Sequence, residues 1–179
     1  MSVSSYLDLL LLMLVLVAAA NDLATRRIPN RLLLSGAVGA LMLHLFGAAP
    51  AAHLWSGLGG MVTGLLLFLP LYCLRGMAAG DVKLLATVGF FRSPQEIAHI
   101  ALWSVCAGGA MALLVVIVNG RLFAALANVR SLLRPLLMRL AGMGAEPEPM
   151  PGPSVGSIPY GLAIATGTLF VMAGRYQYY

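Results

Sequence analysis

The sequence predicts an all-α membrane protein, a polytopic helical bundle with six transmembrane segments, because of its composition and its apolar runs. Of the 179 residues, 60% are hydrophobic and 9% are charged, and the mean hydropathy is +0.92. Soluble domains carry about 25% charged residues, so a water-soluble globule is excluded, and so is a disordered chain. With about 20 residues for each spanning helix, the chain has room for about six spans and short loops.

Six apolar runs mark the expected spans. No Lys or Arg precedes the first run, and Asp8 stands where a signal peptide would be basic, so we expect a retained span. The fourth run has only ten residues, which rise about 15 Å as a helix, half of the hydrocarbon thickness. Gly60 and Gly64 form a GxxxG motif that predicts helix packing within the bundle. The expected spans are residues 5–21, 32–52, 54–74, 82–91, 97–118 and 158–174.

Basic residues predict the orientation of these spans. If the fourth run crosses, nine Lys and Arg lie on one side of the membrane and two on the other. If it turns back, four arginines change sides, so the positive-inside rule favours six crossings with both termini outside the cytoplasm. The net charge of +5 then indicates contact with anionic inner-leaflet lipids, and no nucleic acid is expected as a partner. The expected cytoplasmic residues are Arg26, Arg27, Arg31, Arg75, Lys83, Arg121, Arg130, Arg134 and Arg139, and the expected outer residues are Arg92 and Arg175.

The whole chain, 1–179, is predicted to form a single membrane-embedded domain with a cytoplasmic connection at 119–157. The first part of this connection, 121–140, has apolar residues at helical spacing and four arginines at other positions. This pattern is typical of an interfacial helix on an anionic leaflet, and a solvated helix packed on the bundle is the alternative. The second part, 141–157, is rich in Pro and Gly and is predicted to be a flexible tether.

Two of the six carboxylates have unusual locations. Asp22 directly follows the first apolar run and Asp81 directly precedes the fourth, which places both at the cytoplasmic membrane border. A carboxylate at this border is costly unless it has a partner or a purpose. The other four acids are expected in loops or near the outer end of the first span, and they are Asp8, Glu96, Glu146 and Glu148.

Two carboxylates that lie close together share a proton, because like charges disfavour the ionisation of both. The ionised member can act as a general base on water, and the protonated member can hydrogen-bond the substrate carbonyl and later donate to the leaving nitrogen. Asp22 and Asp81 are therefore candidates for an aspartic-protease pair. A structural role is the alternative: Asp22 pairs with Arg26, and Asp81 caps a helix that begins at Val82.

Motifs around the two acids carry a family resemblance. Asp22 opens D-L-A-T-R-R-I-P-N, and Asp81 lies in G-D-V-K-L-L-A. Together they resemble the two signatures of bacterial prepilin peptidases (type IV leader peptidases), which are six-span membrane aspartyl proteases of the GxGD type. I-P-Y-G at 158–161 belongs to the resemblance, and the absence of a cysteine-rich loop is similar to the short members that serve tight-adherence (Flp) pili. Ala78 stands where the family has its first glycine, which is tolerable if its φ is negative.

The resemblance implies a membrane aspartic endopeptidase that cleaves the short basic leader of a prepilin or pseudopilin at the cytoplasmic face of the bacterial inner membrane. The implied partners are the substrate helix and anionic lipids. Asp22 and Asp81 are the implied catalytic residues. Supporting or substrate-binding roles are expected for Gly80, Lys83, Arg26, Pro159, Tyr160 and Gly161.

No metal or other cofactor is expected, because Cys73 and Cys106 lie inside apolar runs and form no CxxC pair. Lys83 is expected to reach lipid headgroups, and residues 29–30 to form a turn. Two other functions stay open, a proton-coupled transporter subunit and a non-catalytic scaffold of a pilus or secretion machine. The sequence indicates no oligomeric state. Three histidines are expected to lie far apart on the outer half of the bundle, namely His44, His53 and His99.

Overall fold

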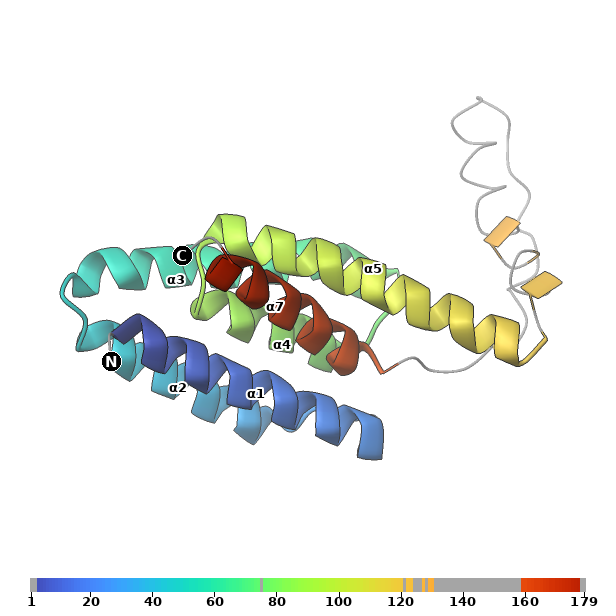
Figure 1. Cartoon of the computed structure of the whole chain (residues 1–179), viewed down its shortest axis with the longest axis horizontal. Coiled ribbons are helices and arrows are strands. Elements are labelled where there is room, and N and C mark those ends of the chain that lie inside the picture. The colour runs from blue at the N-terminus through green and yellow to red at the C-terminus, as the bar shows by residue number, and fades with distance from the viewer. Residues whose placement is uncertain are drawn as a thin grey trace, which may run out of the picture. The chain divides into compact units, whose positions relative to one another are not determined.

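The computed structural model describes residues 3–74, 76–120, 122–123, 127, 129–130 and 159–177. All regular secondary structure in these residues is helical (Figure 1), so the predicted all-α membrane helical bundle is confirmed. The helices are α1 (Val3–Thr25), α2 (Asn30–Leu45), α3 (Pro50–Cys73), α4 (Ala79–Phe90), α5 (Pro94–Val118) and α7 (Tyr160–Gln177).

Two compact units make up the chain. The first comprises Met1–Gly108 and Pro159–Tyr179 and holds every helix listed above except the end of α5, and the second is Gly109–Ile158. The contacts of both candidate aspartates belong to the first unit. Most of the expected interfacial helix at 121–140 and all of the expected tether at 141–157 lie outside the described residues, so these stay predictions, as does the single domain.

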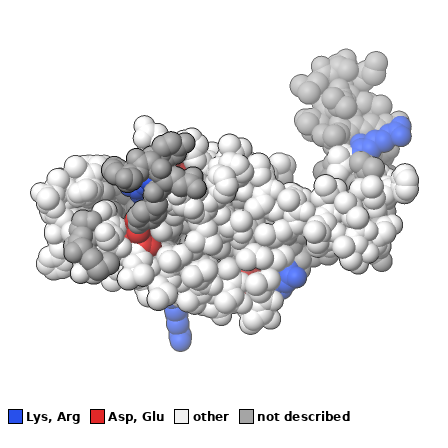
Figure 2. Space-filling view, viewed as in Figure 1, with Lys and Arg blue, Asp and Glu red and all other residues white. Residues whose placement is uncertain are grey.

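Among the described residues, three helices are long and apolar enough to cross a membrane, namely α1, α3 and α5. Over their most apolar stretches only 28%, 22% and 22% of the residues are buried inside the protein, so most of their apolar side chains face outward. On the face shown in Figure 2, few of the described atoms belong to Lys, Arg, Asp or Glu. A surface of this kind is typical of a protein embedded in lipid.

The short α4 is the central helix of the first unit. It contacts α1, α2, α3 and α7, and every residue from Asp81 to Phe90 is buried except Lys83. Its 12 residues rise about 18 Å, which is less than the hydrocarbon thickness. A helix that is apolar on all sides fits inside a bundle, where other helices rather than lipid surround it. Burial therefore explains both the apolar composition and the short length of the fourth run.

Glycines let α3 lie directly against α4. A Cβ at Gly64 would come 2.7 Å from the carbonyl oxygen of Leu85, and a Cβ at Gly60 would collide with the carbonyl oxygen of Gly89. Gly57 faces α4 in the same way. Small residues permit this close approach between membrane helices, so the predicted packing role of Gly60 and Gly64 is confirmed.

Successive helices of the first unit run in alternating directions (Figure 1). We call the end where α1 finishes and α4 and α7 begin the aspartate end, because Asp22 and Asp81 lie there. The other end, where α1 begins and α7 finishes, is called the far end. Asp8 at the far end and Asp22 are 14 residues apart on α1, which is about 21 Å of helix.

One predicted boundary is wrong. The sequence predicts a second span that continues to residue 52, whereas α2 ends at Leu45 and α3 begins at Pro50. Proline favours the first turn of a helix, because its φ is preset and its missing N–H needs no partner there. The apolar residues around Pro50 conceal this break in a hydropathy pattern. The other five helices agree with their predicted spans to within four residues at each end.

Candidate active site

Asp22 lies near the C-terminal end of α1 and is only 6% exposed. Its Oδ2 accepts a hydrogen bond from the backbone N–H of Gly161, with 2.7 Å between nitrogen and oxygen. Gly161 is the second residue of α7, and the first N–H groups of a helix have no partner inside the helix. The start of α7 therefore supplies the hydrogen-bond donor that a buried carboxylate requires.

Gly161 is at a position that leaves no room for a side chain. A Cβ there would lie 2.9 Å from both Cβ and Oδ2 of Asp22, which is closer than ordinary van der Waals contact. Pro159 precedes the helix, and its carbonyl oxygen accepts hydrogen bonds from the N–H groups of Leu162 and Ala163 at 3.1 Å and 3.4 Å. The first turn of α7 is thus closed on itself, and the N–H of Gly161 is directed at Asp22.

Tyr160 fixes the beginning of α7 against other helices. Its ring meets the ring of Phe68 on α3 edge to face, with centroids 6.3 Å apart and an interplanar angle of 89°. Gly108 on α5 lies against the same ring, since a Cβ at Gly108 would come 3.0 Å from the Tyr160 Cζ. Edge-to-face aromatic pairs contribute about 0.5–1.5 kcal/mol beyond the area they bury. Tyr160 therefore holds Gly161 at a defined distance from α1.

Asp81 is buried in the first turn of α4, with 6% of its surface exposed. Its Oδ2 accepts a hydrogen bond from the backbone N–H of Ala78 at 3.1 Å. The structural role considered from the sequence is therefore present, although α4 begins at Ala79 rather than at Val82. Asp81 lies outside the three candidate spans. Burial is the main cause that raises the pKa of Asp81 to about 6, the Ala78 N–H opposes the rise, and the charge of Asp22 adds to it.

The backbone of Ala78 accommodates alanine. Its φ is −81° and its ψ is 154°, an extended conformation that any L-residue adopts. The departure from the family's first glycine therefore causes no backbone strain. Gly80, the glycine before Asp81, also has space for a methyl group, because a Cβ there would meet Ile28 at an ordinary contact distance of 3.6 Å.

Both sequence motifs contact each other at the aspartate end. Ile28 of the R-R-I-P-N segment packs beside Gly80, and the Nζ of Lys83 donates a hydrogen bond to the Oδ1 of Asn30 at 3.4 Å. Lys83, which was expected to reach lipid headgroups, is thus joined to the first residue of α2. Arg26 is exposed and ends α1 with a φ of 55°, the left-handed conformation common at helix C-termini. These contacts fix the loop after Asp22 to the start of α4.

Asp22 and Asp81 are therefore two buried carboxylates at one end of the first unit, within electrostatic range of each other. α7 packs against both of the helices that carry them. Tyr160 is also within electrostatic range of Asp81. Asp22 accepts a short N–H hydrogen bond, and Asp81 retains its proton more readily than an ordinary aspartate. A pair of carboxyl groups in different environments is what general acid–base chemistry requires.

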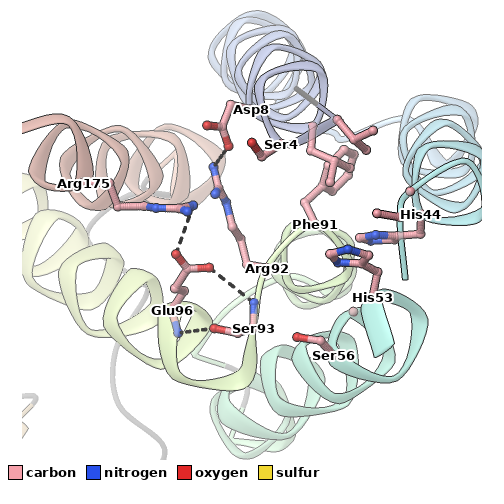
Figure 3. Close-up of a pocket in the computed structure, with 15 residues that line it drawn as sticks. Ser4, Asp8, His44, His53, Ser56, Phe91, Arg92, Ser93, Glu96 and Arg175 are labelled. Atoms are coloured by element: carbon pink, nitrogen blue, oxygen red, sulfur yellow. Dashed lines mark hydrogen bonds and ion pairs between the residues drawn. The ribbon is translucent and has the colours of Figure 1, made fainter. Parts of the chain in front are cut away.

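Polar residues also gather at the far end (Figure 3). The Nη2 of Arg92 lies 2.7 Å from the Oδ1 of Asp8, and the Nη1 of Arg175 lies 3.1 Å from the Oε1 of Glu96. The Glu96 carboxylate accepts a hydrogen bond from the Ser93 N–H, and the Ser93 hydroxyl oxygen accepts one from the Glu96 N–H, both at 3.4 Å. Asp8 and Glu96 thus belong to two ion pairs, one between α1 and the loop before α5 and one between α5 and α7, which sequence reasoning did not predict.

Both ion pairs line a cavity of about 440 Å³. His44 and His53 lie beside it with stacked rings 6.2 Å apart, so the prediction that all three histidines lie far apart is wrong for this pair. The Nε2 of His44 bonds to the carbonyl oxygen of Phe90 at 2.8 Å, which ties α2 to the end of α4. The cavity is at the opposite end of α1 from Asp22.

A model of the type IV leader peptidase family matches residues 9–113. The match covers more than half of the chain and includes both Asp22 and Asp81. The chain belongs to the type IV leader peptidase family. It is accordingly a hydrolase, a peptidase with the apolar helices of a membrane protein. No curated protein and no solved structure matches the chain.

The family match ends before α7, so the contact between Gly161 and Asp22 comes from the structure of this leader peptidase alone. The I-P-Y-G motif indicated a role for Gly161 without indicating its partner. Sequence reasoning treated Asn30 only as part of a turn and did not predict its bond to Lys83. No local signal in the sequence could have joined residues that are 53 positions apart.

Proposed function

We propose that this family member is an aspartic endopeptidase that removes the short basic leader of a prepilin or pseudopilin, with Asp22 and Asp81 as its catalytic residues. The observation that supports the proposal most directly is the convergence of the two motif aspartates. Both are buried, both lie at the aspartate end, and each accepts a backbone N–H. A buried pair of carboxylates is expensive to maintain in a membrane protein, which favours a functional role.

The reaction follows from the two protonation states. The carboxylate of one aspartate removes a proton from water, and the water oxygen forms a bond to the carbonyl carbon of the scissile peptide. The other aspartate donates its proton to the carbonyl oxygen. The first aspartate then returns its proton to the leaving nitrogen, the carbon–nitrogen bond breaks, and the carbonyl re-forms as its oxygen gives a proton back to the second aspartate. One water is consumed, and both aspartates regain their starting states.

The proposed site of action is the cytoplasmic face of the bacterial inner membrane, in a pilus system of the tight-adherence type. Arg26, Arg27 and Arg31 are exposed at the aspartate end, which supports a cytoplasmic location through the positive-inside rule. The substrate's apolar helix would lie in the membrane beside the bundle while its leader reaches the aspartates, and anionic lipids would contact the arginines. Water reaches a site at this border without crossing hydrocarbon.

A direct test is to co-express the chain with a prepilin and to follow leader removal by gel shift. We expect Asp22→Asn and Asp81→Asn each to abolish processing while the protein still accumulates in the membrane. Glu96→Gln is the matched control, because it makes a similar carboxylate-to-amide change at the far end, and we expect it to retain processing. Full processing by either aspartate variant would eliminate the proposed chemistry. Proton-coupled flux in proteoliposomes without cleavage would favour a transporter, and normal pilus assembly in the Asp81→Asn strain would favour a scaffold.

A further inference from the structure

We propose that the start of α7 positions the Asp22 carboxylate for catalysis, with the backbone N–H of Gly161 as its positioning donor. This inference rests on the proposed function for its catalytic meaning. Its physical content, a hydrogen bond that stabilises one carboxylate and holds it in place, can be measured without any peptide cleavage.

The first argument is the hydrogen bond itself. The distance of 2.7 Å from Gly161 N to Asp22 Oδ2 is at the short end of the range for N–H···O contacts, where bonds to ionised acceptors are found. A donor to a carboxylate stabilises its charged form, because the protonated form is a poorer acceptor. The N-terminus of the 18-residue α7 also carries the positive end of its helix dipole, which acts in the same direction.

The second argument is the difference between the two aspartates. Asp81 accepts a longer bond of 3.1 Å from Ala78, a residue of the turn before its own helix. Asp81 also lies at the start of a helix that other helices surround, and burial raises its pKa. The Asp22 carboxylate, in contrast, accepts its hydrogen bond from the first turn of a different helix, α7. The charged and titratable groups identified around Asp22 are Asp81, Tyr160 and Arg26, which directly follows α1 and whose backbone N–H bonds to the carbonyl oxygen of Asp22.

The third argument is the absence of a side chain at Gly161. A Cβ would come within 2.9 Å of Asp22, so the short bond depends on glycine at this position. Tyr160 holds the approach fixed through Phe68 and Gly108. Gly161 acts through Asp22 and is a positioning residue, which is why the I-P-Y-G segment matters although it carries no reactive group.

The test replaces one atom of the backbone. Full-length protein is made by cell-free synthesis in lipid nanodiscs with glycolic acid at position 161, so that an ester oxygen replaces the N–H without adding bulk. The matched control carries the hydroxy-acid analogue of leucine at position 162, whose N–H bonds to Pro159 and not to Asp22. The readouts are kcat and KM for cleavage of a prepilin, measured separately.

We expect the ester at 161 to lower kcat by about tenfold while KM stays nearly unchanged, because one hydrogen bond that positions a reacting carboxylate is lost. The ester at 162 should leave kcat and KM unchanged. Equal kcat values for the two esters would overturn the proposal, because they would show that the Gly161 N–H has no selective effect.

A second measurement needs neither an ester nor activity. The amide proton of Gly161 is observed by NMR in the protein labelled with ¹⁵N-glycine, with and without Asp22→Asn. We expect a downfield resonance that moves upfield in Asp22→Asn, while the Gly109 amide stays unchanged. A Gly161 resonance that ignores Asp22 would refute the inference even if the enzyme cleaves prepilin. A responsive resonance without any cleavage would refute only the proposed function.

Discussion

Replacing Gly161 with alanine should show whether catalysis depends on the exact position of the Asp22 carboxylate as well as on its presence. The new Cβ would lie 2.9 Å from Cβ and Oδ2 of Asp22, and ordinary contact begins at 3.4 Å, so one helix must move by about 0.5 Å or the carboxylate must rotate away. Overpacking of this size costs about 1–3 kcal/mol of stability. Misplacing a reacting group by about 1 Å lowers rates by about 100-fold. We therefore expect kcat/KM to fall by about 10- to 100-fold.

The assay is the initial rate of prepilin cleavage by the purified full-length protein in nanodiscs, together with its thermal unfolding. Gly109→Ala is the matched control, because a Cβ at Gly109 meets nothing within 4 Å and should change the rate by no more than about twofold. Thermal unfolding distinguishes a misplaced carboxylate from a protein that has lost its fold. A Gly161→Ala protein with the wild-type kcat/KM would refute the claim that the short contact to Asp22 matters for catalysis.

Two further predictions concern Asp81 and the far end. Because the pKa of Asp81 is raised to about 6, its proton is lost as the pH rises through this value, so kcat/KM should decline above it. Because folded Asp81 binds its proton more tightly than unfolded Asp81, the free energy of unfolding falls as the pH rises from 3.8 to about 6. At pH 7, Asp81→Asn should therefore melt at a higher temperature than wild type, which calorimetry measures. Arg92→Ala removes the ion pair between the buried Arg92 and Asp8 and should cost about 1.5–3 kcal/mol in denaturant titrations, and an unchanged midpoint would contradict the ion pair's importance.

Local properties of the sequence were enough to predict the class of the protein and most of its helices. Hydropathy adds up along a segment, so an apolar run near the length of a bilayer predicts a helix regardless of its neighbours. The sequence also identifies Asp22 and Asp81 as candidates, because a carboxylate beside an apolar run is unusual and can be recognised without knowledge of the fold. Hydropathy failed at Pro50, where apolar composition continues through a turn that proline imposes.

Only the tertiary structure decided what these residues touch. The bond from Gly161 to Asp22 joins positions 139 apart, and the ion pair of Arg92 with Asp8 joins the loop between α4 and α5 to the beginning of α1. Composition determines that helices form and associate, but side-chain volume determines which faces meet and at what distance. A missing Cβ at Gly161 allows a 2.7 Å bond that any larger residue would prevent. Such contacts exist only after packing has brought distant segments together, so no pattern along the chain could predict them.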